Sequence, residues 1–190
     1  YLHRDIKPNN ILVDENENFI LTDFGLMRAM LDSGITSTSG VVLGTPPYIP
    51  PEIWIGQESS CQSDQYSFAC VINEAITGVP LFSGNTQEII AKHLVRRPEI
   101  TGYPKEIPEN VKFIIQKALS NQPGDRFKDI TAFVDALLDP SSFNVYDYLK
   151  KIKDEEQSSA DKKNLEKLKA KRKRKAITIL VGIPALVLVL

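Results

Sequence analysis

Near its start the chain contains acidic, basic and amide side chains that suit metal-assisted chemistry on a negatively charged group. Asp5 and Lys7 stand two residues apart, Asn10 follows, and Asp23 comes thirteen residues after Asn10. Carboxylate and amide oxygens are the ligands that Mg²⁺ prefers, and a lysine stabilises negative charge that develops beside it. A single Asp is more often a helix cap or a turn residue, so only the whole set of residues points to a reaction.

Three short motifs contain or follow these residues. In order they are His3-Arg4-Asp5-Ile6-Lys7-Pro8-Asn9-Asn10, Asp23-Phe24-Gly25 and Gly44-Thr45-Pro46-Pro47-Tyr48-Ile49-Pro50-Pro51-Glu52. In order and spacing they resemble the catalytic loop, the metal-binding loop and the end of the activation segment of eukaryotic-type (Hanks-type) protein kinases. The resemblance covers residues 1–138 and implies an α+β, protein-kinase-like fold. The expected part is the mainly helical C-terminal lobe with a small β-ribbon, without the N-terminal lobe.

The resemblance implies a role for each matching residue in phosphoryl transfer from ATP, with Mg²⁺, to a hydroxyl group. Asp5 would accept the hydrogen bond and the proton of the substrate hydroxyl, and Lys7 would place a cation beside the transferred phosphate. Asn10 and Asp23 would bind the metal ions that bridge the ATP phosphates. Leu12 would form the apolar floor of the adenine pocket. The predicted cofactor-binding residues are therefore Lys7, Asn10, Leu12 and Asp23.

Two of the matching residues indicate the class of substrate. Serine/threonine kinases carry Lys at the place of Lys7, whereas tyrosine kinases usually carry Ala or Arg nearby. Thr45 also resembles the serine/threonine form, in which its hydroxyl bonds the catalytic Asp and Lys. The predicted enzyme is a serine/threonine protein kinase, and its predicted catalytic residues are Asp5, Lys7, Asn10, Asp23 and Thr45.

Other matching residues are structural in the family. Glu52 and Arg126 match a buried ion pair that fixes the activation segment to the helical core, and breaking such a pair costs about 3–5 kcal/mol. Asp64 matches a core-helix aspartate that holds the backbone of the catalytic loop. Pro50 departs from the family, which usually has Ala or Ser there. The predicted structural residues are His3, Arg4, Phe24, Gly25, Glu52, Asp64 and Arg126.

The segment of residues 30–47 is rich in Ser, Thr and Gly and is expected to be a long surface loop. Thr36 and Thr38 stand where bacterial transmembrane kinases of this type place autophosphorylated threonines. A phosphate there would pair with Arg4 and order the loop. The alternative is that Ser and Thr are simply good loop residues.

The hydrophobic pattern predicts the elements that position these motifs. We expect strands at 11–13 and 19–21 around a polar turn, and helices from Ser63 to a stop at Gly78, at 86–94 with Thr86 as cap, at 109–119 and at 130–138. The helix that begins at Ser63 is apolar nearly all round, which is typical of a core helix. Two cysteines, Cys61 and Cys70, show neither a metal-ligand pattern nor disulfide density, so we expect reduced thiols in a cytosolic domain.

The composition changes after residue 138. Residues 139–175 are predicted to be a basic juxtamembrane linker, either a solvated helix or a flexible segment, because residues 150–175 hold twelve Lys or Arg against five Asp or Glu. Residues 176–190 are apolar and are predicted to start a single membrane-spanning helix, with the kinase on the cytoplasmic side of the cell membrane. A buried core helix or a basic nucleic-acid patch fits this order less well.

The sequence also leaves alternatives for the whole protein. Residues 1–190 contain no Gly-rich loop, ATP-positioning Lys or partner Glu, which the family's N-terminal lobe supplies. We therefore expect the chain by itself to be inactive. The expected partners are ATP, proteins with accessible Ser or Thr, a membrane and a second copy of the chain, but not nucleic acid. The alternative function is a pseudokinase scaffold, which has no chemical need for Asp5, Lys7, Asn10 and Asp23.

Overall fold

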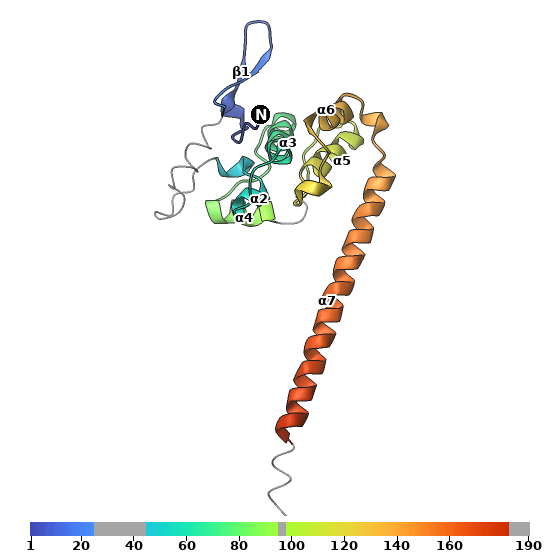
Figure 1. Ribbon diagram of the computed structural model, residues 1–190. Coiled ribbons are helices and arrows are strands. Elements are labelled where there is room, and N and C mark those ends of the chain that lie inside the picture. Colours follow the sequence, from blue (N-terminus) through green and yellow to red (C-terminus); the bar gives the residue numbers. More distant parts are fainter. Residues whose placement is uncertain (25–44, 95–97, 183–190) are drawn as a thin grey trace, which may run out of the picture. The chain divides into compact units, whose positions relative to one another are not determined.

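The computed structural model describes residues 1–24, 45–94 and 98–182, and for residues 171–182 the backbone alone. The chain divides into two compact units, Tyr1–Phe143 and Asn144–Leu190. The first unit is mainly helical and has one two-stranded sheet in its described part (Figure 1). The expected α+β class, with helices dominating and one small β-ribbon, is confirmed.

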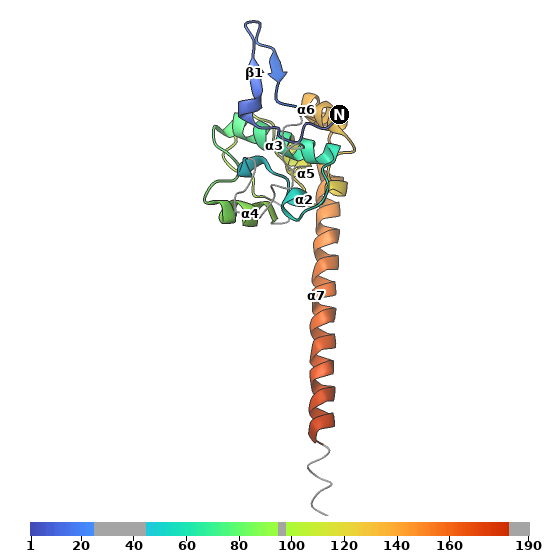
Figure 2. The same ribbon diagram turned by 60° about the vertical axis from the view of Figure 1, so that its left-hand side comes forward.

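The β-ribbon is formed by β1 (Ile11–Val13) and β2 (Phe19–Leu21), with the bounds that the sequence predicted. The strands are antiparallel, and Ile11 is paired with Leu21. The carboxylate of Asp14 closes the polar turn between the strands, because one oxygen accepts from the backbone N–H groups of Asn16 and Asn18 at 2.8 Å each. In both views the ribbon projects from the helices (Figures 1 and 2).

Helix α3 (Cys61–Thr77) is the core helix of the first unit, as its apolar pattern predicted. It contacts the 3₁₀ helix η2 (Pro46–Tyr48), α5 (Glu109–Ala118) and α6 (Ile130–Leu138). The helix stops at Gly78, whose φ of 78° is a left-handed conformation that glycine adopts without strain. Its buried neighbours include Ile114, Ile115, Leu119 and Phe133.

Helix α4 (Thr86–Leu94) has the predicted bounds, but its predicted cap is wrong. The capping residue is Asn85, whose side-chain oxygen accepts from the backbone N–H of Glu88 at 3.0 Å. In return Glu88 accepts from the backbone N–H of Asn85 at 3.2 Å, which completes a capping box. An Asn directly before the helix is as good a cap as any residue type, so Thr86 becomes the first helical residue.

We expect Asn85→Ala to lower the free energy of unfolding by about 1 kcal/mol, because the substitution leaves helix N–H groups without this acceptor. Thr86→Ala is the matched control and should change stability by less than about 0.5 kcal/mol. Urea unfolding of the intact protein, followed by circular dichroism, measures both. Equal losses for the two variants would contradict the assignment of the cap.

The remaining elements of the first unit are short or have bounds close to the predicted ones. Helix α2 (Pro51–Trp54) contacts α4, and the two lie side by side in both views (Figure 2). The 3₁₀ helices η1 (Pro8–Asn10), η3 (Pro123–Asp125) and η4 (Pro140–Ser142) connect the larger elements. Helix α5 ends one residue before the predicted position. Both cysteines are free thiols, with Cys61 exposed and Cys70 buried.

In its described part, the second unit consists of helix α7 (Val145–Gly182). Of the two expectations for the basic segment, the helix is the one observed, because Lys, Glu and Ala are good helix formers, and its residues 150–170 are mainly exposed. The predicted membrane-spanning segment lies partly in this helix, and its residues 183–190 are outside the described part of the chain. No helix within the described residues is long and apolar enough to cross a membrane.

Candidate active site

The backbone of the loop before β1 is held by a carboxylate from the core helix. Asp64 of α3 accepts from the backbone N–H of His3 at 2.7 Å and from that of Arg4 at 2.8 Å. Arg4 has a φ of 71°, a left-handed conformation that is uncommon for residues other than glycine. Because one carboxylate binds both N–H groups, the start of α3 fixes the bend that precedes Asp5.

The buried ring of His3 connects this loop to the segment after β2. Its Nε2 lies 2.7 Å from the carbonyl oxygen of Thr22, and since a carbonyl only accepts, Nε2 is the protonated nitrogen. Its Nδ1 then accepts from the backbone N–H of Asp5 at 3.3 Å. The ring also lies 4.6 Å from the ring of Phe24. His3 therefore joins the Asp5 loop to the residues on both sides of Asp23.

Asp5, Lys7 and Asn10 form one hydrogen-bonded group. The Lys7 Nζ donates to Asp5 Oδ2 at 2.7 Å, and the side chains of Lys7 and Asp5 are 20% and 14% exposed. The Asn10 Nδ2 donates to the Asp5 carbonyl at 2.8 Å and to Asp5 Oδ2 at 3.1 Å. These bonds turn the amide N–H₂ of Asn10 toward Asp5. The Asn10 Oδ1, which is the amide atom able to accept hydrogen bonds, takes no part in them.

The base of the β-ribbon places Asp23 next to this group. The carbonyl of Asn10 accepts from the backbone N–H of Thr22 at 2.8 Å and from its hydroxyl at 3.2 Å, which extends the strand register by one pair. Asp23 follows directly, is exposed and has a φ of 62°. A left-handed aspartate of this kind is often found at functional sites. The two predicted metal ligands thus come from adjoining ends of the two strands.

The β-ribbon and Phe24, three residues after it, expose apolar side chains. Leu12 is 54% exposed, and Phe24 is 63% exposed. Val13, Phe19 and Ile20 are exposed on the same ribbon. Large apolar side chains gathered on one small element mark a surface that binds a ligand or another part of a protein.

A small cavity lies beside Asp5. It is lined by Arg4 and Asp5 of the loop, by Thr45 and Tyr48, and by Asp64 among others. Lys7 binds Asp5 directly, and the expected hydrogen bond from the Thr45 hydroxyl to this pair stays a prediction. The other predicted residues of this region, Gly25, Thr36 and Thr38, lie outside the described part of the chain.

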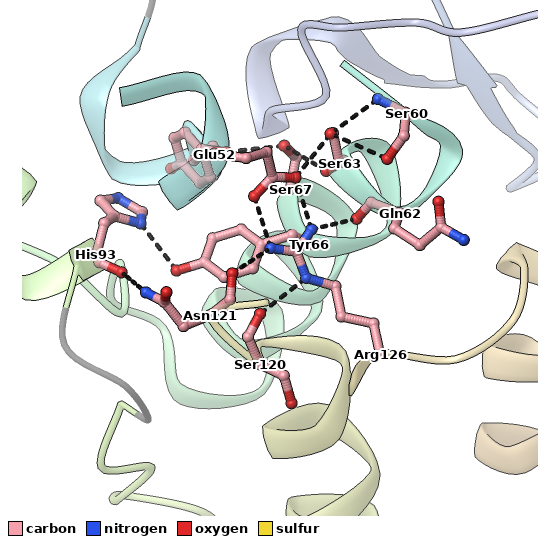
Figure 3. Close-up of polar contacts among 11 residues, drawn as sticks. Glu52, Ser60, Gln62, Ser63, Tyr66, Ser67, His93, Ser120, Asn121 and Arg126 are labelled. Carbon is pink, nitrogen blue, oxygen red and sulfur yellow. Dashed lines mark hydrogen bonds and ion pairs between the residues drawn. The ribbon is translucent and has the colours of Figure 1, made fainter. Parts of the chain in front are cut away.

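Glu52 and Arg126 form a buried ion pair (Figure 3). Two parallel contacts of 2.8 and 2.7 Å join the guanidinium to the two carboxylate oxygens. The remaining N–H groups donate to the carbonyls of Ser120, Gln62 and Asn121 at 2.8, 2.7 and 3.2 Å. A guanidinium has five N–H groups, and here each has an acceptor.

The Glu52 carboxylate is stabilised in its charged form. Burial alone raises the pKa of Glu52, but the hydrogen bonds and the charge of Arg126 lower it, and the pKa lies below the ordinary value. The hydroxyl of Ser63 adds a hydrogen bond of 2.7 Å to Oε1. Because Glu52 belongs to α2 and Ser63 to α3, this hydrogen bond ties the segment after Thr45 to the core helix.

Several buried polar residues of this region were missed by the sequence analysis. Gln65 of α3 accepts from the backbone N–H of Phe127 at 3.0 Å and donates to the Phe127 carbonyl at 3.3 Å. His93 of α4 is buried and contacts Tyr66. The available signal was position: His93 stands four residues after the buried Ile89, and residues spaced by four share one face of a helix.

Comparison with known proteins agrees with this geometry. The model of the protein kinase domain matches residues 1–138. The chain therefore belongs to the protein kinase family, as its three motifs predicted.

Within that family, bacterial serine/threonine kinases are among the similar proteins. The chain is 38% identical over 128 residues to serine/threonine-protein kinase PknD of Mycobacterium tuberculosis. The aligned residues are 66% of this chain and 19% of PknD. It is 35% identical over 136 residues to PknA of the same species, covering 72% of this chain and 31% of PknA. It is 34% identical over 131 residues to PknB of Mycolicibacterium smegmatis, covering 67% of this chain and 21% of PknB. The match thus spans less than a third of each of these relatives.

Proposed function

We propose that the intact protein transfers the γ-phosphate of ATP to serine and threonine hydroxyls of proteins, and that residues 1–138 supply the catalytic loop for this transfer. The observation that carries the proposal is the Asp5 carboxylate, held by Lys7 and Asn10 beside a cavity. A fixed carboxylate of this kind accepts the proton of a hydroxyl, and the adjacent ammonium stabilises negative charge on a transferred phosphate. Membership of the kinase family supports this reading.

Mg²⁺ fits the residues that lie beside Asp5. The Asn10 Oδ1 and the exposed carboxylate of Asp23 are oxygen donors, which Mg²⁺ requires, and they come from adjoining ends of the β-ribbon. When bound, the ion neutralises charge on the ATP phosphates. Asn10 and Asp23 would hold it, while the exposed Leu12 is placed on the ribbon where an apolar surface suits the adenine base.

Arg4 supports a proposal about regulation. Its buried Nε atom has no hydrogen-bond partner among the described residues, and an unpaired buried donor is costly. A phosphate on Thr36 or Thr38 would supply oxygen acceptors and negative charge for this guanidinium. We therefore retain phosphorylation of one of these threonines as part of the proposal.

Membrane attachment remains a proposal that rests on composition. Residues 169–175 are basic apart from one alanine, and the apolar residues 176–190 follow at once. Such a junction is typical of the cytoplasmic end of a membrane-spanning helix. The glycine-rich loop and the ATP-positioning lysine of the family do not occur in residues 1–190, so we propose that these residues alone do not transfer phosphate.

The test of the proposed function is the dependence of phosphate transfer on Mg²⁺. We expect the intact protein to phosphorylate a serine peptide only with a divalent cation, and Asp23→Asn to raise the half-maximal Mg²⁺ concentration by roughly tenfold or more, because one anionic ligand is lost. Glu15→Gln, in the exposed turn of the same ribbon, is the control with the same charge change. Phosphate transfer that does not depend on Mg²⁺ would overturn the proposal, and so would a wild type that transfers no phosphate.

A further inference from the structure

A buried histidine connects helix α4 to the segment that follows Thr45, and the chemistry proposed above does not use it. His93 is 1% exposed. Its Nε2 lies 2.9 Å from the carbonyl oxygen of Pro46, and its Nδ1 lies 2.9 Å from the hydroxyl of Tyr66. Figure 3 shows the ring reaching the Tyr66 hydroxyl. The ring thus joins α4 to both the core helix and the start of η2.

The two contacts define one protonation state of the ring. The carbonyl of Pro46 only accepts, so Nε2 carries the hydrogen, and Nδ1 accepts from the Tyr66 hydroxyl. Burial lowers the pKa of His93 to about 4, although the hydrogen bond to Pro46 opposes this shift. At neutral pH the ring is therefore an uncharged donor toward Pro46. This contact is built from buried groups with complementary donors and acceptors.

A hydrogen bond to the Pro46 carbonyl can hold this segment in place. Pro46 and Pro47 have no backbone N–H, so their carbonyl oxygens are the backbone groups through which other elements can bind them. At the other end of η2, the Tyr48 carbonyl accepts from the Ser67 hydroxyl of α3 at 2.8 Å. Thus α4 holds the start of η2, and α3 holds its end. Thr45 and Tyr48, on either side of the two prolines, both line the cavity beside Asp5.

We propose that His93 is a positioning residue for the protein substrate: its hydrogen bond to Pro46 fixes Thr45 and η2 beside Asp5 and thereby sets the affinity for the substrate segment that lies there. The inference rests on the proposed kinase function and adds a determinant of peptide affinity to it. His93 touches neither the peptide nor the nucleotide, and acts through Pro46. Its loss should therefore weaken peptide binding more than it slows transfer.

A pair of substitutions of equal length tests the polar contacts of the ring. His93→Gln keeps an N–H₂ donor near the position of Nε2. His93→Met places a side chain of nearly the same length as Gln there, but this side chain has no donor. In the intact protein we expect His93→Met to raise the KM for a serine peptide roughly tenfold, because the Pro46 carbonyl loses the shorter of its two hydrogen bonds and keeps only the one from the Ile49 N–H at 3.3 Å. The kcat and the KM for ATP should stay within about twofold of the wild type. His93→Gln should recover most of the peptide affinity.

Ile89→Val controls for general weakening of α4, because it removes one buried methyl group from the same helix face and leaves His93 unchanged. It should lower the melting temperature without changing the peptide KM. Equal peptide KM values for the Gln and Met variants would overturn the inference while leaving an active kinase. A wild type that transfers no phosphate would overturn the proposed function, and this inference with it.

A measurement on the wild type does not depend on how the variants fold. Nitrogen-15 NMR of the imidazole distinguishes the two neutral tautomers, and we expect His93 to carry its hydrogen on Nε2 at neutral pH. A ring protonated on Nδ1 alone has no hydrogen to donate to Pro46, and this result would overturn the inference even if the kinase is active.

Discussion

Asp5→Asn will abolish most of the phosphate transfer by the intact protein. The expected fall in kcat is on the order of 10²–10⁴-fold, because an amide cannot take the proton of the attacking hydroxyl. The substitution keeps the shape of the side chain, and an amide oxygen still accepts from Lys7, whose Nζ lies 2.7 Å from Asp5 Oδ2. The KM for ATP should change little, since Asn10 and Asp23 remain. Initial rates at saturating ATP and peptide measure this effect.

Asp135→Asn is the matched control, because Asp135 is an exposed residue of α6 and lies outside the catalytic loop. It makes the same chemical change and should leave kcat unaltered. An Asp5→Asn variant that folds normally and keeps more than about a tenth of the wild-type kcat would show that another group takes the proton.

Arg126→Ala will cause a large loss of stability in the first unit. Removing one partner of a buried ion pair costs about 3–5 kcal/mol, because the other charge stays buried without compensation. Here the loss leaves Glu52 unpaired and removes the donors to three carbonyls. It also removes the guanidinium that lies 4.8 Å from the ring centroid of Tyr66. Urea unfolding at neutral pH measures the change.

Two further variants identify the cause. Arg126→Lys keeps the charge but not the planar fork with its five donors, so it should recover less than half of the loss. Lys128→Ala removes an exposed cation two residues away and should change stability by less than about 0.5 kcal/mol. A loss below about 1 kcal/mol for Arg126→Ala would mean that the ion pair does not hold this region together.

The sequence predicted the elements well where local chemistry is strong. The ribbon strands Ile11–Val13 and Phe19–Leu21 and helix Ile130–Leu138 have the predicted bounds, because polar turns and caps delimit them. The cap of α4 was misassigned because Asn85 and Thr86 are adjacent capping types, and only the backbone geometry distinguishes them. Propensity alone cannot decide between two neighbouring residues of similar rank.

The candidate site was predictable as a set of residues but not as a set of contacts. The motifs named Asp5, Asn10 and Asp23, yet they did not indicate that Asn10 would donate both hydrogen bonds toward Asp5. The contact between His93 and Pro46 joins residues 47 positions apart, and nothing in a local pattern encodes such a pairing. Tertiary packing of α4 against η2 creates it.

The most direct test of the central claim is the initial rate of phosphate transfer from ATP, by the intact protein, to one peptide carrying either serine or tyrosine at its acceptor position. The geometry of Asp5, Lys7 and Asn10, with membership of the kinase family, predicts rapid labelling of the serine peptide and little of the tyrosine peptide. If the intact protein binds ATP but labels neither peptide, the result would contradict the proposed phosphate transfer. The protein would then be a nucleotide-binding scaffold.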